Sequence, residues 1–175
     1  FHFIAFSADD PMKQKLHDYP GVTMSVCQLR PESRGFVRAR SADAQERPAI
    51  QPNFLDTPND CRTMVDGLKL ARAISAQPAY DSHVKREALP GPDVADDDAL
   101  LDYIRETGGT IYHPSGTCKM GLDTMAVVDE RLRVRGVENL RVADCSVMPS
   151  VISGNTNAPA IMIGEKCAAM IIEDS

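Results

Sequence analysis

The chain has 175 residues, of which 43% are hydrophobic and 25% are charged, and 19 basic against 25 acidic residues give it a net charge of -6 at pH 7. This length is sufficient for one domain with a substantial core, or for a piece of a larger protein. The basic residues are scattered along an acidic chain, a distribution that argues against a nucleic-acid-binding protein.

The five cysteines follow no ligand or disulfide pattern. They are odd in number, widely spaced and without a CxxC pair, which argues against a disulfide framework and a zinc site. We therefore expect a reducing compartment and no bound metal. No apolar run approaches the roughly 18 residues that a membrane span needs. The chain starts on strand-like residues without a methionine, and we expect it to be a segment of a longer protein.

The first third of the chain predicts short strands. Residues 1–6 form an apolar and aromatic run typical of a buried strand, and 22–29 alternate as a half-buried strand does. A turn at 31–35 and renewed alternation over 35–40 predict a hairpin. A further strand over 49–54 extends it, at an edge or a bulge because of its proline.

Two helices are predicted next. Thr57 is a suitable N-cap, a proline follows it, and Asp60 lies near the positive end of the helix dipole. This helix should end before Pro78. A second helix should begin at the acidic cluster 96–98 and stop at the glycine pair 108–109.

The last third combines short strands with a long helix. Strands are predicted over 126–129, 131–135 and 140–143, followed by an irregular loop over 149–157. A helix opens at Ala158 and is apolar over most of its circumference, as helices buried in large proteins usually are. Strands followed by helices predict an α+β fold in which helices cover one face of a largely antiparallel sheet.

His113 is the strongest candidate for chemistry. It follows a predicted strand end and precedes a proline and a glycine, so a strand would deliver its ring to a loop, where catalytic groups concentrate. The alternative is a partly buried histidine bonded to a backbone carbonyl. The other histidines (His2, His17 and His83) lie in ordinary surroundings.

Other polar positions allow two interpretations each. The loop 153–159 places short hydrogen-bonding side chains at a helix N-terminus, which suits an electron-rich ligand edge, yet the same residues are ordinary turn and cap formers. Asp144 ends a predicted strand, where ligands bind in α/β sheets, or it caps a turn. Cys118 and Cys145 have no base placed by spacing and are interpreted as buried thiols.

Three long blocks resemble a known family. IYHPSGTCKMG, AVVDERLRVRGVENLRVADCSVMP and GNTNAPAIMIGEKCA are similar to the C-terminal part of the glucose-methanol-choline (GMC) flavoprotein oxidoreductases, most closely the choline dehydrogenase and alcohol dehydrogenase branch. LRPESRGFVRARS and PNFLDTPND resemble the family's substrate-domain segments. The resemblance implies that residues 1–110 are part of a substrate-binding domain. It also implies that 111–175 carry the active-site histidine block and return to the FAD-binding domain, supplying its last strand and helix.

The resemblance implies the FAD-dependent oxidation of an alcohol, and we expect a primary alcohol to be converted to an aldehyde by hydride transfer to flavin. By resemblance, His113 is the active-site histidine, placed as a base to accept the substrate hydroxyl proton or to stabilise the alkoxide while hydride passes to the flavin. Asn155 matches the second active-site position, and as an amide it can bond the substrate oxygen but cannot act as a base. The remaining matches are flavin-binding positions. Two of them match positions near the ribityl and pyrophosphate portion of the flavin, Asp144 and Cys145. Three match positions near the pyrimidine edge of the isoalloxazine, Asn157, Ala158 and Pro159.

One family motif is missing. The dinucleotide fingerprint GxGxxG does not occur, so we expect the isolated chain to bind FAD weakly if at all and to have no turnover. The expected partners are a small-molecule alcohol and the N-terminal FAD-binding portion of the same enzyme, with no nucleic acid and no metal. The expected location is cytoplasmic, or peripheral to the inner membrane.

Three questions stay open. The chain could be a stand-alone binding module that lost catalysis, or it could belong to an oxidase branch in which oxygen is the acceptor. An aromatic content of 5% and the lack of tryptophan weaken choline as the substrate without excluding it, because part of the pocket would come from elsewhere.

Overall fold

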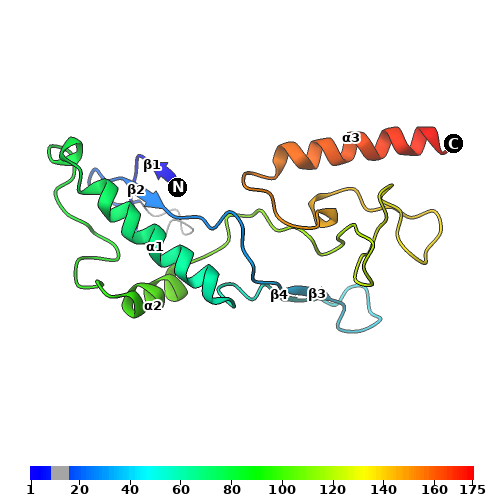
Figure 1. Ribbon diagram of the computed structural model, residues 1–175, viewed down its shortest axis with the longest axis horizontal. Coiled ribbons are helices and arrows are strands. Elements are labelled where there is room, and N and C mark those ends of the chain that lie inside the picture. The colour runs from blue at the N-terminus through cyan, green and yellow to red at the C-terminus, as the bar shows by residue number, and fades with distance from the viewer. Residues whose placement is uncertain (9–15) are drawn as a thin grey trace. The chain divides into compact units, whose positions relative to one another are not determined.

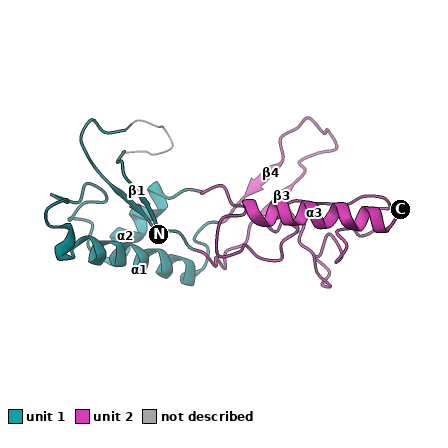
Figure 2. Ribbon diagram, turned by 90° about the horizontal axis from the view of Figure 1, so that it is seen from above, with its two compact units in different colours: residues 1–28, 54–109 teal, residues 29–53, 110–175 magenta. Residues whose placement is uncertain are grey.

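The computed structural model describes residues 1–8 and 16–175. The chain divides into two compact units: residues 1–28 with 54–109, and residues 29–53 with 110–175 (Figure 2). Among the described residues, each unit contains one small antiparallel sheet, and the three α-helices are divided between them (Figure 1). The α+β class is therefore confirmed.

Unit 1 combines a two-stranded sheet with two packed helices. Strand β1 (His2–Ile4) pairs antiparallel with β2 (Thr23–Ser25), and Phe3 lies opposite Met24. Helix α1 (Pro58–Ser75) packs on α2 (Asp97–Thr107), and the short 3-10 helix η2 (Pro78–Tyr80) follows α1.

The two helices of unit 1 begin and end as their sequence predicts. The Thr57 hydroxyl accepts the backbone N–H of Asp60 at 3.2 Å, and the Asp96 carboxylate accepts that of Ala99 at 2.8 Å. Gly108 ends α2. The apolar faces meet in a core of Val65, Leu100 and Ile104, of which Leu100 is fully buried.

Unit 2 consists largely of loops around a core that one helix completes. Strand β3 (Phe36–Arg38) pairs antiparallel with β4 (Ala49–Gln51). After a long irregular stretch come the 3-10 helix η3 (Cys145–Val147) and α3 (Asn157–Glu173). The core comprises residues from the loops, η3 and α3: Val128, Leu132, Val147, Met148, Ile163 and Cys167.

The strand predictions need correction. The predicted hairpin between 22–29 and 35–40 is wrong, because β2 pairs with β1 and β3 pairs with β4. Two separate two-stranded sheets thus replace one largely antiparallel sheet. The run 1–6 is not a buried strand, since Phe1 and Phe3 are about half exposed.

The strands predicted over 126–143 are reduced to isolated bridges, such as Val128 with Val134 and Arg133 with Arg141. The backbone turns too tightly there for regular strands, because Leu132, Gly136 and Asn139 all have positive φ. The strand over 49–54 is confirmed in β4, although it is shorter than predicted.

The long apolar helix is confirmed in α3, although it begins one residue earlier than predicted. Ile163 and Cys167 face the core, whereas Ile161, Met162 and Ile172 are exposed. Within residues 1–8 and 16–175, the helices all fall short of the length and apolarity needed to cross a membrane.

Candidate functional site

The block 111–121 lies alongside η3 in unit 2. Alternate residues of the block donate their N–H groups to successive carbonyls of η3, in the pairs Gly116 to Cys145 (3.4 Å), Cys118 to Ser146 (2.9 Å) and Met120 to Val147 (2.8 Å). Val147 is fully buried, and Met148 beside it is also in the core. The block is therefore bonded to a segment that is anchored in the core of the unit.

The backbone on both sides of His113 is sharply turned. Tyr112 has φ 63°, a left-handed conformation that costs a residue with a Cβ roughly 1–3 kcal/mol. Its N–H is bonded to the Thr110 hydroxyl at 3.0 Å. Gly116 has φ 87°, and a Cβ there would lie 3.3 Å from the carbonyl oxygen of Met148. The backbone conformation of the neighbouring residues thus restricts the orientation of the His113 side chain.

The ring of His113 contacts the start of α3. Its Nδ1 lies 2.9 Å from the hydroxyl oxygen of Thr156, 43 residues further along the chain. Thr156 is the N-cap residue of α3 and directly follows Asn155. His113 is half-buried and Asn155 is exposed. The structure thus brings His113 next to the residue that follows Asn155. The hydrogen bond of the ring is made with the Thr156 hydroxyl and not with a backbone carbonyl.

The positions matched to flavin contacts lie around the same helix start. Asp144 is the N-cap of η3, where its exposed carboxylate accepts the N–H of Ser146 at 2.7 Å. Cys145 points inward, since its thiol donates to the carbonyl oxygen of Thr156 at 3.6 Å. The other three form the first turn of α3, two exposed and one half-buried: Asn157, Ala158 and Pro159.

Sequence reasoning missed Thr156, the residue that links these groups. Its side chain is buried (7% exposed), its hydroxyl bonds His113, and its carbonyl oxygen accepts both the Cys145 thiol and the N–H of Ala160. The available signal was a threonine directly before a helix, which predicts a cap and not a contact with a distant ring.

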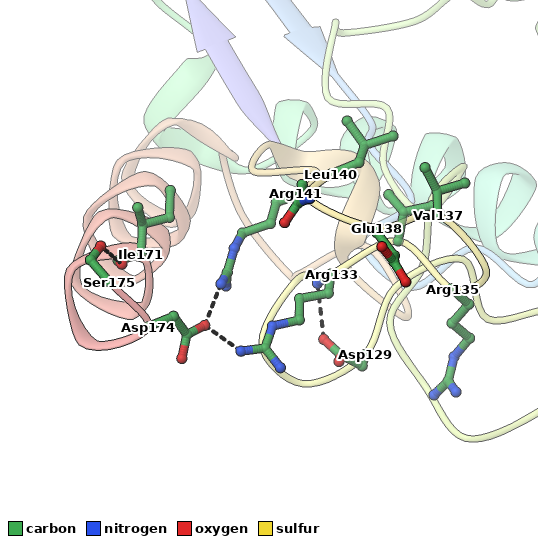
Figure 3. A pocket seen from close by; sticks show the side chains of 12 residues that line it. Asp129, Arg133, Arg135, Val137, Glu138, Leu140, Arg141, Ile171, Asp174 and Ser175 are labelled. Carbon is green, nitrogen blue, oxygen red and sulfur yellow. Dashed lines mark hydrogen bonds and ion pairs between the residues drawn. The ribbon is translucent and has the colours of Figure 1, made fainter.

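A cluster of charges at the far end of α3 was also missed. Asp174 forms ion pairs with Arg131, Arg133 and Arg141, and Arg131 also pairs with Glu173. Figure 3 shows Arg133 and Arg141 converging on the Asp174 carboxylate. These hydrogen bonds, from Arg133 first and Arg141 second, hold the pKa of Asp174 well below its usual range.

The Asp174 cluster borders an open groove of about 830 Å³. His113 and Asn155 do not line this groove, so it is separate from the candidate site. In the described part of the chain, no group of three or more histidine, cysteine or acidic side chains is arranged to hold a metal ion.

Comparison with known proteins gives a consistent result. Residues 31–164 match the model of the GMC oxidoreductase family. The chain is 46% identical to an alcohol dehydrogenase [acceptor] of Pseudomonas putida over 172 residues, which are 98% of this chain and 31% of that protein. It is 43% identical to an oxygen-dependent choline dehydrogenase of Pseudomonas syringae pv. tomato over 98% of this chain and 30% of that protein.

Solved structures agree with the sequence matches. The crystal structure of pyridoxine 4-oxidase from Mesorbium loti aligns with a TM-score of 0.75 and 35% identity, over 81% of this chain and 28% of that one. A fungal aryl-alcohol oxidase aligns with a TM-score of 0.75 and 33% identity, over 83% of this chain and 24% of that one.

The fold, the match to the family model and these identities together show that the chain belongs to the GMC oxidoreductase family. It spans about a third of the length of the curated relatives it matches.

Proposed function

We propose that this chain supplies the proton-accepting side of an FAD-dependent oxidoreductase that oxidises a primary alcohol to an aldehyde. His113 acts as the base, and Asn155 bonds the substrate oxygen. The observation that carries the proposal is the 2.9 Å contact between Nδ1 of His113 and the hydroxyl of Thr156, the residue after Asn155. The relatives named for alcohol and choline oxidation support the substrate class.

The contact suits the chemistry of a base. A neutral imidazole carries one donor and one acceptor nitrogen, and a bond at Nδ1 leaves Nε2 for the substrate. Removal of the hydroxyl proton by Nε2 raises the electron density on the oxygen as the neighbouring carbon loses its hydride. Asn155 is exposed at the same helix start and can donate its amide N–H to that oxygen.

The start of α3 fits one edge of a flavin. Thr156 forms no side-chain cap bond with the helix, within the described part of the chain, so the first N–H groups and the positive end of the dipole suit an electron-rich carbonyl edge. Asn157 and Ala158 would lie against that edge, with Pro159 behind them, while Asp144 would approach the ribityl and pyrophosphate portion. Cys145 would support Thr156 from inside, since its thiol faces the carbonyl of that residue. Bound FAD would supply the hydride acceptor.

The remainder of the flavin site would come from an N-terminal FAD-binding portion of the same enzyme, completed by the C-terminal segment of this chain with α3. The chain lacks GxGxxG and spans about a third of its relatives' length. The exposed apolar side chains Ile161, Met162 and Ile172 on α3 are suited to contact with such a portion. Alone, the chain should bind FAD weakly and have no turnover.

A binding module without catalysis is the second candidate, favoured by the same missing motif. Titration of FAD into the pure chain, followed by flavin fluorescence, tests how much of the flavin site lies in this chain, and the activity of the FAD-loaded protein that carries the chain separates the two candidates. Weak binding is expected if the site needs the other portion. Sub-micromolar affinity would contradict the expectation that most of the flavin site lies outside this chain.

The central test is His113→Ala in the FAD-loaded protein that carries this chain with the N-terminal portion. Loss of the base should lower the rate of flavin reduction by alcohol at least about a hundredfold in stopped-flow measurements. His83→Ala is the matched control, because His83 is exposed in unit 1. A near-wild-type rate in His113→Ala would rule out the role given to this histidine.

A further inference from the structure

We propose that Thr156 is a positioning residue for His113: its hydroxyl accepts the Nδ1–H of the imidazole and so presents the unprotonated Nε2 to the substrate. The inference rests on the proposed function. It starts from the 2.9 Å separation of Nδ1 and the threonine oxygen. No sequence match assigned this residue a role.

Thr156 lies where a threonine ordinarily stabilises its own helix. A side chain at the N-cap accepts a backbone N–H of the first turn, and its loss costs typically about 1 kcal/mol. Thr156 makes no such bond among the residues that the structure describes, because its hydroxyl is directed to His113. The helix therefore gives up a cap in favour of a contact with a side chain 43 residues away.

The threonine is held firmly enough to position a ring. Its side chain is buried, so the hydroxyl needs a partner within the protein, and the imidazole provides one. Its carbonyl oxygen accepts the Cys145 thiol at 3.6 Å and the N–H of Ala160 at 2.9 Å. A residue held by hydrogen bonds at both its hydroxyl and its carbonyl group orients a catalytic side chain better than a mobile loop residue does.

The direction of the hydrogen bond decides the chemistry. If Nδ1–H donates to Thr156, Nε2 keeps its lone pair; the alcohol O–H bond breaks, a new N–H bond forms at Nε2, and the ring becomes an imidazolium. If instead the threonine hydroxyl donates to Nδ1, Nε2 carries the proton and cannot accept another. The proposal requires the first arrangement.

The backbone of the histidine restricts the alternatives. Tyr112 is held in a left-handed conformation immediately before His113, so rotation of the segment to reach another partner would disturb the turn. The Cys145 thiol faces the carbonyl of Thr156 and does not compete for the hydroxyl. Thr156 is thus suited to select one ring orientation and one tautomer.

The test uses the FAD-loaded protein with Thr156→Val, which keeps the shape and removes the hydroxyl, and Thr156→Ser, which keeps the hydroxyl. Flavin reduction should slow about tenfold or more in the valine variant, as expected for loss of one hydrogen bond that orients the base, and stay within about threefold of wild type in the serine variant. Binding of alcohol should change less than the reduction rate.

A second readout does not depend on activity. With ¹⁵N-labelled histidine, the wild-type protein above neutral pH should show His113 protonated at Nδ1, and Thr156→Val should shift the ring toward the Nε2-protonated tautomer. The His113→Gln variant identifies the signal. A wild-type His113 protonated at Nε2 would overturn the proposal, even if the valine variant failed to fold.

The outcomes separate this inference from the proposed function. If His113→Ala leaves flavin reduction unchanged, the proposed function fails. If His113→Ala is slow while both Thr156 variants keep the wild-type rate and tautomer, only the positioning role fails. Equal loss of activity in the serine and valine variants, with an unchanged tautomer, would also reject it in favour of a packing role.

Discussion

Helices α1 and α3 each begin after a threonine, and the two threonines are used differently. Thr57 has an extended backbone, and its hydroxyl accepts the N–H of Asp60 at 3.2 Å. Thr156 has a helical backbone conformation, and its hydroxyl bonds the ring of His113. The same residue type at the same helix position is structural in unit 1 and directed toward a candidate base in unit 2.

The difference teaches where this sequence departs from local rules. At α1 the cap, the proline and the acidic residue of the first turn all favour the same helix start. At α3 the cap is given up, and residue 112 nearby is held in a left-handed conformation. Departures of this kind are expected at functional sites, where geometry is maintained at some loss of stability.

Helix α3 is held at other points instead. Ile163 and Cys167 are buried in the core, and the last residues are bonded to arginines of the loop 129–141. A carboxylate such as Asp174 at the C-terminal end of a helix opposes the dipole, so the surrounding arginines offset an unfavourable placement. The C-terminal end of α3 thus has an anchoring role, and its N-terminal end is left for polar contacts.

Asn155→Ala should give the largest effect that sharpens this comparison. The loss of one hydrogen bond to the substrate oxygen should lower the rate of flavin reduction about tenfold in the FAD-loaded protein. Because Asn155 is exposed, the free energy of unfolding should not change. Stopped-flow reduction and urea denaturation measure the two quantities, with Asn59→Ala, an exposed asparagine of α1, as the control. Lower stability with an unaltered rate would make the start of α3 structural, like that of α1.

Thr57→Val should have a smaller effect, confined to stability. Loss of the cap should lower the free energy of unfolding by about 1 kcal/mol, with Thr57→Ser close to wild type. The cost should be the same in a His113→Ala background, since Thr57 belongs to unit 1. By contrast, the cost of Thr156→Val should nearly vanish in that background, because its hydroxyl has lost its partner. Urea denaturation of wild type, His113→Ala and each threonine-to-valine variant with and without His113→Ala provides the two double-mutant cycles. If both threonines behaved alike, the difference between the two helix starts would not hold.

The helices of unit 1 could be predicted because their signals are local. Thr57, Asp60 and the acidic run before Leu100 lie within a few residues of the elements they start, and the apolar spacing defines the faces. Strand pairing was not predictable in the same way. Residues 22–29 and 35–40 were predicted to pair with each other, but the strands within them pair with β1 and β4. Short alternating runs do not specify which strand pairs with which.

The candidate site was only partly predictable for the same reason. His113 and Asn155 could be chosen by resemblance, but the contact that joins their segments is made by Thr156, whose local pattern indicates a helix cap. The arginines around Asp174 come from three places along the loop and converge through its irregular path. Such long-range contacts depend on backbone turns, including the positive φ of Leu132, that composition and periodicity do not reveal.

Asp174→Asn should give the smallest effect, a pH-dependent loss of stability at the anchored end of α3. The pKa of Asp174 is lowered chiefly by hydrogen bonds from Arg133 and Arg141. A lowered folded-state pKa means that the stabilisation is fully present above the ordinary aspartate pKa of about 3.9 and is lost as the pH falls below it. The variant should therefore be less stable than wild type near neutral pH, and the difference should close progressively below about pH 4.

Urea denaturation of both proteins over that range measures the difference, and Glu138→Gln, an exposed acid lining the same groove, is the matched control. Added salt should reduce the difference near neutral pH, because the ion pairs are partly exposed. A gap between wild type and Asp174→Asn that stayed constant down to acidic pH would show that the carboxylate charge does not hold α3. The position of α3 would then depend on core packing alone. The ion pairs of Asp174 would not offset the stability that the helix loses because Thr156 forms no cap bond.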